Sequence, residues 1–164
     1  MNPSLVGSEM CIRDRLRPKS RGEVTLESSD PFADPLIDPK FLSHPDDMQD
    51  MIDGYKIMMK VLNTEPFSKY IKEHTSRPID INDDADIEKA IREEADTVYH
   101  PVGTCKMGSD DMSVVSHELK VHKIANLRVV DASIMPTLVG GNTNAPTIMI
   151  GEKASDLIKA DWAI

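Results

Sequence analysis

The 164-residue sequence predicts a mixed α+β fold in which helices lie over an antiparallel sheet. Three observations predict it: apolar residues recur at helical spacing in three stretches, polar and apolar residues alternate over residues 21–28, and glycine-rich turns with short apolar runs follow residue 98. Apolar residues make up 40% of the chain and charged residues 29%, as in soluble globular proteins. A chain of this length can bury a substantial core.

Charge and cysteine content narrow the possible function classes. The sequence has 28 acidic against 19 basic residues and a net charge of −9, which argues against a nucleic-acid partner. No apolar run reaches the roughly 18 residues that a membrane-spanning helix needs. Two cysteines, Cys11 and Cys105, are too few for a disulfide framework and are consistent with a reducing compartment.

Residues 1–15 differ in character from the rest of the chain. They lack the apolar core and cleavage site of a signal peptide, and they show neither helical nor strand periodicity. Leu5 to Asp14 resembles one translated reading frame of a transposase adapter that is used in sequencing libraries. We therefore expect residues 1–15 to be non-native and the natural sequence to be cut near Leu16; the alternative is a short disordered native tail. In either case Cys11 does not enter the interpretation of function.

The first regular element after Leu16 is predicted to be a strand. Residues 21–28 alternate, with Val24 and Leu26 on one face, and Ser29-Asp30-Pro31 ends the pattern. Residues 31–42 contain three prolines among apolar residues, which indicates an extended, packed connector.

Two helices follow this connector. Ser43 can cap the first, Pro45 lies at its start, and the helix is expected to end near Asn63. Its apolar face is rich in methionine and favours core packing over ligand binding. Its members are Met48, Met51, Ile52, Tyr55, Met58, Met59 and Leu62. A short helix is predicted from Pro66 through Ile71, before Arg77-Pro78 ends it.

A third helix begins after Asp83, which can cap it. Its predicted buried face consists of Ile87, Ala90, Ile91 and Ala95. Residues 80–96 contain eight acids and two bases, and this charge run is expected to form a solvated surface.

After Val98 the sequence predicts short strands and turns before a last helix. Residues 121–130 contain two strand-like pieces around Ala125-Asn126, and Gly140-Gly141 lies in a loop. The C-terminal helix is reached through residues 144–147. Its predicted buried face consists of Ile148, Ile150, Ala154, Leu157 and Ile158.

Metal and hydrolase sites receive little support from the sequence. The five histidines and two cysteines form neither a Cys-x-x-Cys nor a His-Glu-x-x-His motif, so no metal site is predicted. Cys105 and His100 could form a nucleophile–base pair of a hydrolase, but no orienting third residue is evident. A small buried thiol is the favoured interpretation of Cys105.

Three blocks carry a family resemblance: YHPVGTCKMG at 99–108, LRVVDASIMP at 127–136 and GNTNAPTIMIGEKASDLI at 141–158. In order and spacing they resemble the C-terminal third of the glucose-methanol-choline (GMC) family of flavin oxidoreductases, above all its bacterial choline-dehydrogenase-like and alcohol-dehydrogenase-like members. RPKSRGEV at 17–24 also resembles the start of the family's substrate domain. The resemblance thus covers nearly everything after Leu16. It implies a substrate-binding region over residues 16–110 and, over 111–164, a strand-loop-helix segment that completes the FAD domain.

The resemblance also implies roles for individual residues. His100 matches the family's active-site histidine, and Asn142 matches its second active-site residue, a histidine or asparagine. Asp131 and Ala132 match a turn beside the FAD pyrophosphate and ribityl chain, whereas Asn144 and Thr147 match the stretch under the flavin ring. Such chemistry is physically reasonable, because alcohol oxidation needs a base for the hydroxyl proton and imidazole can serve near neutral pH. Asn142 can donate to the same oxygen and hold the alcohol near the flavin.

The sequence departs from the family pattern in three places. Ser116-His117-Glu118 replaces an acidic turn that commonly contains proline or glycine, and residues 123–126 lack a glycine often found there. No Gly-x-Gly-x-x-Gly dinucleotide fingerprint occurs. The adenosine half of FAD would therefore be bound by a region that this sequence does not contain.

These observations lead to an expected function. The chain is expected to be the C-terminal portion of an FAD-dependent alcohol or choline-like dehydrogenase that oxidises a primary alcohol to an aldehyde, and to be inactive alone. The electron acceptor, a quinone carrier or oxygen, stays open. The expected location is the bacterial cytoplasm or the periphery of the inner membrane. The alternative is a stand-alone, non-catalytic binding module on the same scaffold.

Overall fold

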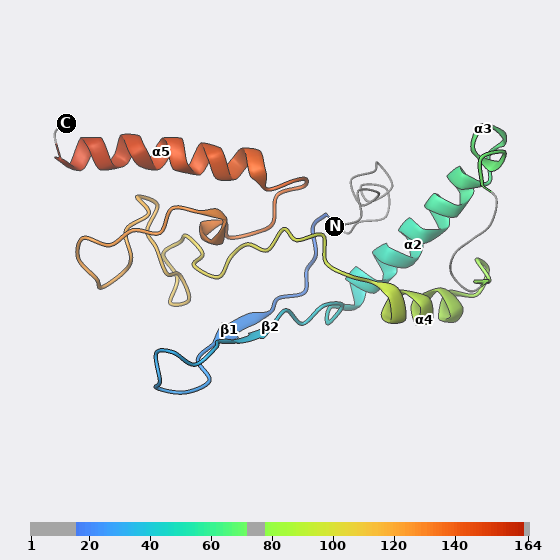
Figure 1. Ribbon diagram of the computed structural model, residues 1–164, viewed down its shortest axis with the longest axis horizontal. Coiled ribbons are helices and arrows are strands. Elements are labelled where there is room, and N and C mark those ends of the chain that lie inside the picture. The colour runs from blue at the N-terminus through green and yellow to red at the C-terminus, as the bar shows by residue number, and fades with distance from the viewer. Residues whose placement is uncertain (1–15, 72–77, 163–164) are drawn as a thin grey trace. The chain divides into compact units, whose positions relative to one another are not determined.

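A computed structural model describes residues 16–71 and 78–162 (Figure 1). The described residues fall into two compact units: unit 1 comprises residues 16–21, 40–71 and 78–98, and unit 2 comprises residues 22–39 and 99–162. Helices and a small antiparallel sheet confirm the mixed α+β class. The expectations for residues 1–15, Cys11 included, lie outside the described residues. The division into regions 16–110 and 111–164 stays a prediction.

Unit 1 is built on helix α2, Pro45–Leu62, and helix α4, Asp84–Glu94. The expected Ser43 cap is wrong: His44 is the N-cap of α2, and its Nδ1 accepts a hydrogen bond from the Asp46 amide at 3.2 Å. The reason is Pro45, which keeps the preceding residue out of the helical region and is itself suited to the first helical position. Asp83 caps α4 as predicted, with its side chain accepting from the Ala85 amide.

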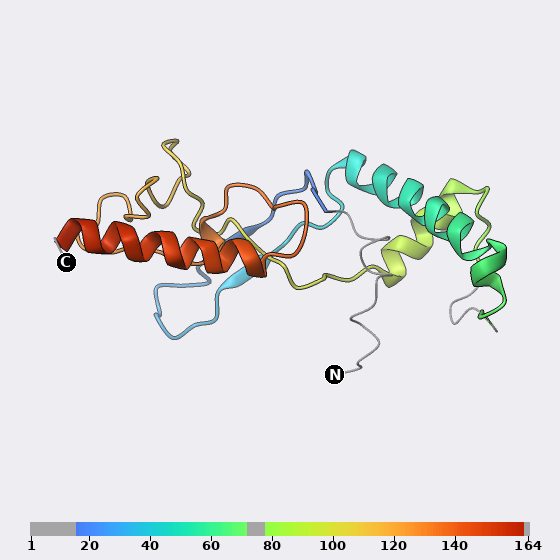
Figure 2. The same cartoon turned by 90° about the horizontal axis from the view of Figure 1, so that it is seen from above.

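The core of unit 1 lies between α2 and α4, which contact each other and lie at an angle in both ribbon views (Figures 1 and 2). Its buried members are Met48 and Ile52 from α2 and Ile87 and Ile91 from α4. Met51 and Tyr55 pack partly against this core, so the first half of the methionine-rich face of α2 is confirmed as core. The other predicted members, Met58, Met59 and Leu62, are half-buried and lie outside it. Ala95 is exposed, contrary to expectation, because the chain leaves the helix there with extended backbone angles.

A buried carboxylate ties the beginning of unit 1 to α2. The side chain of Asp47 is only 1% exposed. Its Oδ1 accepts from the Lys19 amide at 2.8 Å, and its Oδ2 accepts from the amide and hydroxyl of Ser20 at 2.8 and 2.5 Å. The Ser20 hydroxyl oxygen in turn accepts from the His44 amide at 3.0 Å. Such a buried charge is tolerated because charge-assisted hydrogen bonds satisfy it.

The short helix α3 spans Glu65–Ser68 and is shorter than the predicted 66–71. After Ser68 the chain makes tight turns, in which the Tyr70 amide donates to the Phe67 carbonyl and the Ile71 amide to the Ser68 carbonyl. The expected end at Arg77-Pro78 falls partly outside the described residues.

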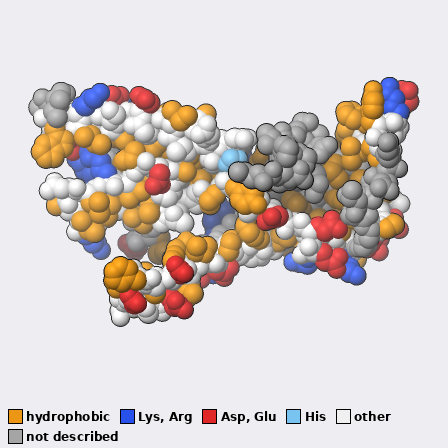
Figure 3. Space-filling model, viewed as in Figure 1, with side chains coloured by type: hydrophobic (Ala, Val, Ile, Leu, Met, Phe, Trp, Pro, Cys, Tyr) orange, Lys and Arg blue, Asp and Glu red, His pale blue; other side chains and the backbone are white. Residues whose placement is uncertain are grey.

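Unit 2 contains the hairpin of strand β1, Glu23–Thr25, and strand β2, Leu36–Asp38, in which Val24 pairs with Ile37. β1 lies within the predicted strand, whereas β2 was expected to be connector. A Cβ on Gly22 would lie 2.3 Å from the Asp38 carbonyl oxygen, so only glycine permits this close approach. Both strands are exposed on each face, and apolar and acidic side chains cover the hairpin (Figure 3). Phe32 in its loop is 93% exposed.

Between residues 107 and 128 the chain forms isolated bridges instead of extended strands. They join Met107 with Val115, Val115 with Val121, and Lys120 with Arg128, so the two strand-like pieces predicted over 121–130 are reduced to single pairings. Lys123 and Asn126 adopt left-handed backbone angles, with φ of 64° and 61°. Left-handed angles of this kind favour glycine, which the sequence lacks over residues 123–126.

The core of unit 2 joins these turns to the 3₁₀-helix η2, Ala132–Ile134, and the long helix α5, Asn144–Trp162. Its buried members are Val115, Leu119, Ile134, Met135, Ile150 and Ala154. Ile148 and Ile158 of α5 are exposed rather than buried, because α5 is apolar on more than one face and only one face meets this core. Among residues 16–71 and 78–162, no helix is long and apolar enough to cross a membrane.

A charge cluster holds the last turns of α5 against the bridged segment. The Asp161 carboxylate accepts from Lys120 Nζ and from Arg128 Nη2, each at 2.7 Å. The two bases keep the pKa of Asp161 below its ordinary value, with the Lys120 hydrogen bond as the largest cause. These ion pairs connect the end of α5 to Lys120 and Arg128, which an isolated bridge pairs with each other.

Candidate active site

His100 leaves the backbone at a constrained position in unit 2. Tyr99 before it has a left-handed φ of 61°, and Pro101 after it disfavours helical backbone at the histidine. The His100 ring is half-buried, and its Nδ1 lies 2.9 Å from the Thr143 hydroxyl oxygen. One ring nitrogen is therefore held by the protein, and the ring orientation is fixed by a residue 43 positions along the chain.

Thr143 comes directly before α5 and is buried, with 9% of its surface exposed. Its carbonyl oxygen accepts from the amide of Thr147 at 3.0 Å and from the hydroxyl of Thr147 at 2.6 Å. The histidine block and the 141–158 block therefore meet at the N-terminus of α5. Thr143 was not predicted from the sequence, where its position between two candidate residues is the one signal that points to it.

Asn142 and Asn144 flank Thr143 and are both exposed. Each is therefore the direct sequence neighbour of Thr143, whose hydroxyl oxygen contacts His100. Thr147 lies one helical turn further on and is half-buried. The structure thus brings His100, Thr143 and Thr147 together by hydrogen bonds, and it places the two asparagines beside them on the chain.

The block at 127–136 adds the turn at Asp131 and Ala132. Asp131 caps η2, and its Oδ1 accepts from the Ser133 amide at 2.8 Å and the Ser133 hydroxyl at 2.5 Å. The amide of Cys105 donates to the Ser133 carbonyl at 3.0 Å, and that of Met107 to the Ile134 carbonyl at 2.7 Å. The histidine block is therefore bonded directly to the turn that carries Asp131. All predicted site residues lie in unit 2.

Cys105 is a half-buried free thiol. The ring of His100 bonds to Thr143, so the described contacts give no support to a cysteine–histidine nucleophile pair. Within the described ranges, no group of three or more histidine, cysteine or acidic side chains is arranged to hold a metal ion.

A carboxylate beside the histidine block is strongly stabilised in its charged form. The pKa of Asp110 is lowered from its ordinary 3.8 to about 2, first by a hydrogen bond from Lys106, then by the Ser113 hydroxyl and the Met112 amide. The corresponding distances are 2.9 Å to Lys106 Nζ, 2.9 Å to Ser113 Oγ and 2.9 Å to the Met112 nitrogen. Asp110 thus closes the turn that follows the histidine block.

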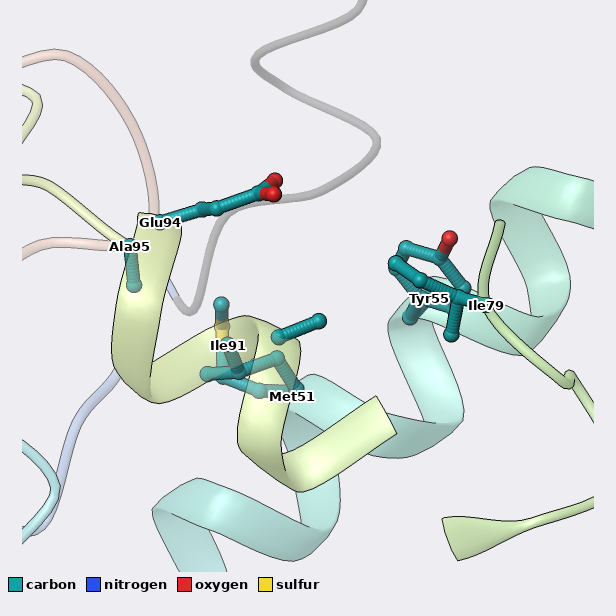
Figure 4. A pocket seen from close by; sticks show the side chains of 7 residues that line it. Met51, Tyr55, Ile79, Ile91, Glu94 and Ala95 are labelled. Atoms are coloured by element: carbon teal, nitrogen blue, oxygen red, sulfur yellow. The ribbon is translucent and has the colours of Figure 1, made fainter. Parts of the chain in front are cut away.

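Unit 1 has a separate small pocket between α2 and α4. In Figure 4, Tyr55 and Ile79 lie together in one part of it, and Ile91 lies beside Met51 in another. Of the described residues that line it, Glu94 alone is charged. None of the predicted site residues lines this pocket, and its largely apolar walls offer few groups for chemistry.

Comparison with known proteins identifies the family. Residues 18–151, most of the chain, match the GMC oxidoreductase family. The chain belongs to this family. This GMC oxidoreductase sequence is 50% identical to an alcohol dehydrogenase [acceptor] of Pseudomonas putida over 150 residues, which is 90% of the chain and 27% of that protein. It is 45% identical over 149 residues to an oxygen-dependent choline dehydrogenase of Klebsiella pneumoniae, covering 91% of the chain and 27% of the relative.

Solved structures give the same assignment. A formate oxidase of Aspergillus oryzae, described in work on its FAD modification, matches 89% of the chain with 33% identity and a TM-score of 0.84. A pyridoxine 4-oxidase matches 86% of the chain with 30% identity and a TM-score of 0.79. The chain covers 26% and 28% of these proteins. This GMC chain therefore spans about a quarter of the length of the relatives it matches. Another matching structure is an FAD-dependent oxidoreductase from Chaetomium thermophilum, with 29% identity and a TM-score of 0.82 over 91% of the chain.

Proposed function

We propose that this chain forms the C-terminal part of an FAD-dependent alcohol dehydrogenase that oxidises a primary alcohol, choline-like or aliphatic, to an aldehyde. The observation that carries the proposal is the hydrogen bond between His100 and Thr143. It joins the histidine block to the N-terminus of α5, beside which Asn142, Asn144 and Thr147 lie along the chain. The alcohol and choline dehydrogenase relatives support the substrate class.

In this proposal His100 is the base. Its Nδ1 is occupied by Thr143, so Nε2 is the ring atom left to accept the hydroxyl proton of the alcohol. Asn142 donates an amide hydrogen bond to the same oxygen and holds the alcohol in one orientation. When bound, FAD supplies the acceptor for the hydride that leaves the alcohol carbon. The proton and the hydride together account for the oxidation of alcohol to aldehyde.

The residues on the flavin side fit such a cofactor chemically. The first amides of α5, at Asn144 and Ala145, lie where a 19-residue helix presents unbonded N–H groups and its positive dipole end. Asp131 uses Oδ1 for Ser133, which leaves Oδ2 to accept from a ribityl hydroxyl. The amide of Ala132 and the hydroxyl of Thr147 complete the set that we assign to the cofactor.

The remaining parts of the enzyme belong to sequence outside this chain. We assign residues 16–110 to the substrate-binding region and residues 111–164 to the segment that returns to the FAD domain. The isolated chain is then expected to bind no stoichiometric FAD and to have no activity. The electron acceptor of the whole enzyme is a quinone carrier or oxygen.

A chimaera tests the proposal. Residues 16–164 replace the matching C-terminal segment of the Pseudomonas putida alcohol dehydrogenase, to which the chain is 50% identical. We expect the chimaera to retain FAD and to show anaerobic bleaching of the flavin with primary alcohols. His100→Ala should slow the bleaching by about 10²–10⁴-fold, the usual contribution of a general base. Re-oxidation by a soluble quinone or by oxygen then identifies the acceptor.

The matched control is His117→Ala, which removes an exposed histidine of the same unit and should leave the rate unchanged. FAD content per protein shows whether each variant has folded. An FAD-loaded His100→Ala chimaera that is reduced as fast as its parent would refute the role of His100.

The two asparagines are separated by a second pair of variants. Asn142→Ala should slow flavin reduction at normal FAD content, because it removes a donor to the substrate oxygen. Asn144→Pro removes the backbone N–H at the first position of α5, where proline is tolerated, so it should lower FAD retention and leave the reduction rate of the loaded fraction nearly unchanged. The opposite pattern would exchange the two roles.

A further inference from the structure

We propose that Thr143 is the positioning residue of the active-site histidine: its hydroxyl oxygen accepts the Nδ1–H of His100 and thereby leaves the Nε2 lone pair free for the alcohol proton. This inference rests on the proposed function for the role of His100 as base. The contact itself is independent of that role, since it is a feature of the folded chain.

The contact is short and well shielded. Thr143 Oγ1 and His100 Nδ1 are 2.9 Å apart, the threonine is 9% exposed, and the histidine is half-buried. A hydrogen bond in such a place is costly to lose, because water does not readily replace the missing partner. The hydrogen bond therefore restricts the rotation of the ring and determines which ring nitrogen carries the proton.

Both partners are held on rigid supports. Thr143 is fixed by its carbonyl, which accepts from the amide and the hydroxyl of Thr147 in the first turn of α5. His100 is fixed by the left-handed backbone at Tyr99 and by Pro101. The pair can thus set the direction of Nε2 without rearrangement of either segment.

The direction of the hydrogen bond follows from which ring nitrogen must carry the hydrogen when His100 acts as a base. A neutral imidazole carries one N–H, so Nε2 can accept a proton only when Nδ1 carries the hydrogen. After Nε2 takes the proton of the alcohol, both ring nitrogens are donors. A Thr143 oxygen that accepts from Nδ1–H is correctly oriented in both states, whereas a Thr143 hydroxyl that donates to Nδ1 would have to rotate.

Thr143→Val in the FAD-loaded chimaera tests the inference, because valine keeps the shape of threonine and removes the hydroxyl. We expect the flavin reduction rate at saturating alcohol to fall about tenfold, the factor that corresponds to the loss of one neutral hydrogen bond. Thr143→Ser should restore most of the rate, since serine returns the hydroxyl. Thr104→Val, an exposed threonine of the same unit, is the matched control and should be neutral.

A spectroscopic measurement keeps the test decisive where a variant folds poorly. Nitrogen-15 NMR of the histidine rings in the parent chimaera should show a protonated Nδ1 and an unprotonated Nε2 for neutral His100. Thr143→Val should produce a mixture of the two tautomers. A neutral ring protonated on Nε2, or an unchanged rate and tautomer in Thr143→Val, would overturn the inference.

The outcomes for the two proposals are distinguishable. A chimaera that no alcohol reduces contradicts the proposed function, while the ring-nitrogen measurement still decides the contact with Thr143. A chimaera in which His100→Ala is slow but Thr143→Val is fast keeps the proposed function and refutes the role of Thr143 alone.

Discussion

Unit 1 and unit 2 are stabilised by different kinds of interaction. Unit 1 consists mainly of α2 and α4, and each helix supplies to their shared core two buried residues that lie one turn apart, Met48 and Ile52 or Ile87 and Ile91. Unit 2 has one long helix, and most of its remaining structure consists of turns joined by backbone hydrogen bonds between distant residues, such as Cys105 to Ser133. The unit with little regular structure carries every predicted site residue, so the chemistry depends on the non-local contacts.

The largest expected effect comes from one substitution made in each core. Ile87→Ala in unit 1 and Ile134→Ala in unit 2 each remove a buried isoleucine, and each should lower the local free energy of unfolding by about 2–5 kcal/mol. Hydrogen exchange of the chimaera, resolved by peptide, measures where protection is lost. Ile87→Ala should affect α2 and α4, and Ile134→Ala should affect residues 99–162. Loss of protection in both units from either variant would show that they unfold as one.

The next effect concerns the buried carboxylate of unit 1. Asp47→Asn should weaken its bonds to the amides of Lys19 and Ser20 and lower the stability of unit 1 by about 1.5–3 kcal/mol, the usual contribution of hydrogen bonds to a charged group. Asp50→Asn, an exposed acid of the same helix, is the control. Faster exchange at residues 19–20 in the Asp47 variant alone is the expected result. Equal effects of the two variants would contradict the anchoring role.

Alanine substitutions at two glycines should change the free energy of unfolding in opposite directions. Gly103 has a left-handed φ of 89°, and an added Cβ would lie 3.3 Å from the Met135 carbonyl, so Gly103→Ala should destabilise unit 2 by about 1–2 kcal/mol. Gly54 lies within α2 with open space around it, so Gly54→Ala should stabilise unit 1 by about 0.5–1 kcal/mol. Denaturant titrations of the two variants compare them. The same sign at both positions would argue against the described backbone at Gly103.

The smallest effect is a pH dependence near the histidine block. Because the pKa of Asp110 is lowered to about 2 in the folded chain, its carboxylate favours the folded state above pH 3.8, and this contribution is lost as the pH falls toward 2. Lys106→Met removes the largest cause and should raise the pKa of Asp110 toward 3.8. Ser113→Ala should raise it less. Carbon-13 NMR of the carboxyl group measures each value, and an unchanged pKa in Lys106→Met would exclude the ion pair as the cause.

The regular elements of the fold were largely predictable, because their signals are local. Helical periodicity identified α2, α4 and α5, and Asp83 was predicted as a cap. Strand β2 was missed because it lies between Pro35 and Pro39, where prolines favour extended backbone without indicating a pairing partner. The exposure of Ile148 in α5 was missed for a related reason, since periodicity does not show which of two apolar faces meets the core.

The candidate site was predictable only for residues that match a position of the family's motifs. His100, Asn142 and Asp131 were predicted as site residues from block resemblance, and all three lie in unit 2. Thr143 was not found, because its significance depends on a contact with a residue 43 positions away. Neither periodicity nor composition indicates such a pairing. The order of the blocks along the sequence therefore identified the family, whereas the hydrogen-bond partner of the histidine required coordinates.

The attachment of Lys19 and Ser20 to Asp47 has a practical consequence for protein engineering. A crossover point placed between residues 20 and 44 would take these two amides from one parent and the buried carboxylate from another. In recombined enzymes joined there, the Lys19 and Ser20 amides and the Asp47 carboxylate would come from different parents, and their hydrogen bonds could be lost even where every helix was intact. Libraries that exchange this segment among relatives should therefore place the junction upstream of Pro18, so that the anchor and its carboxylate are inherited together.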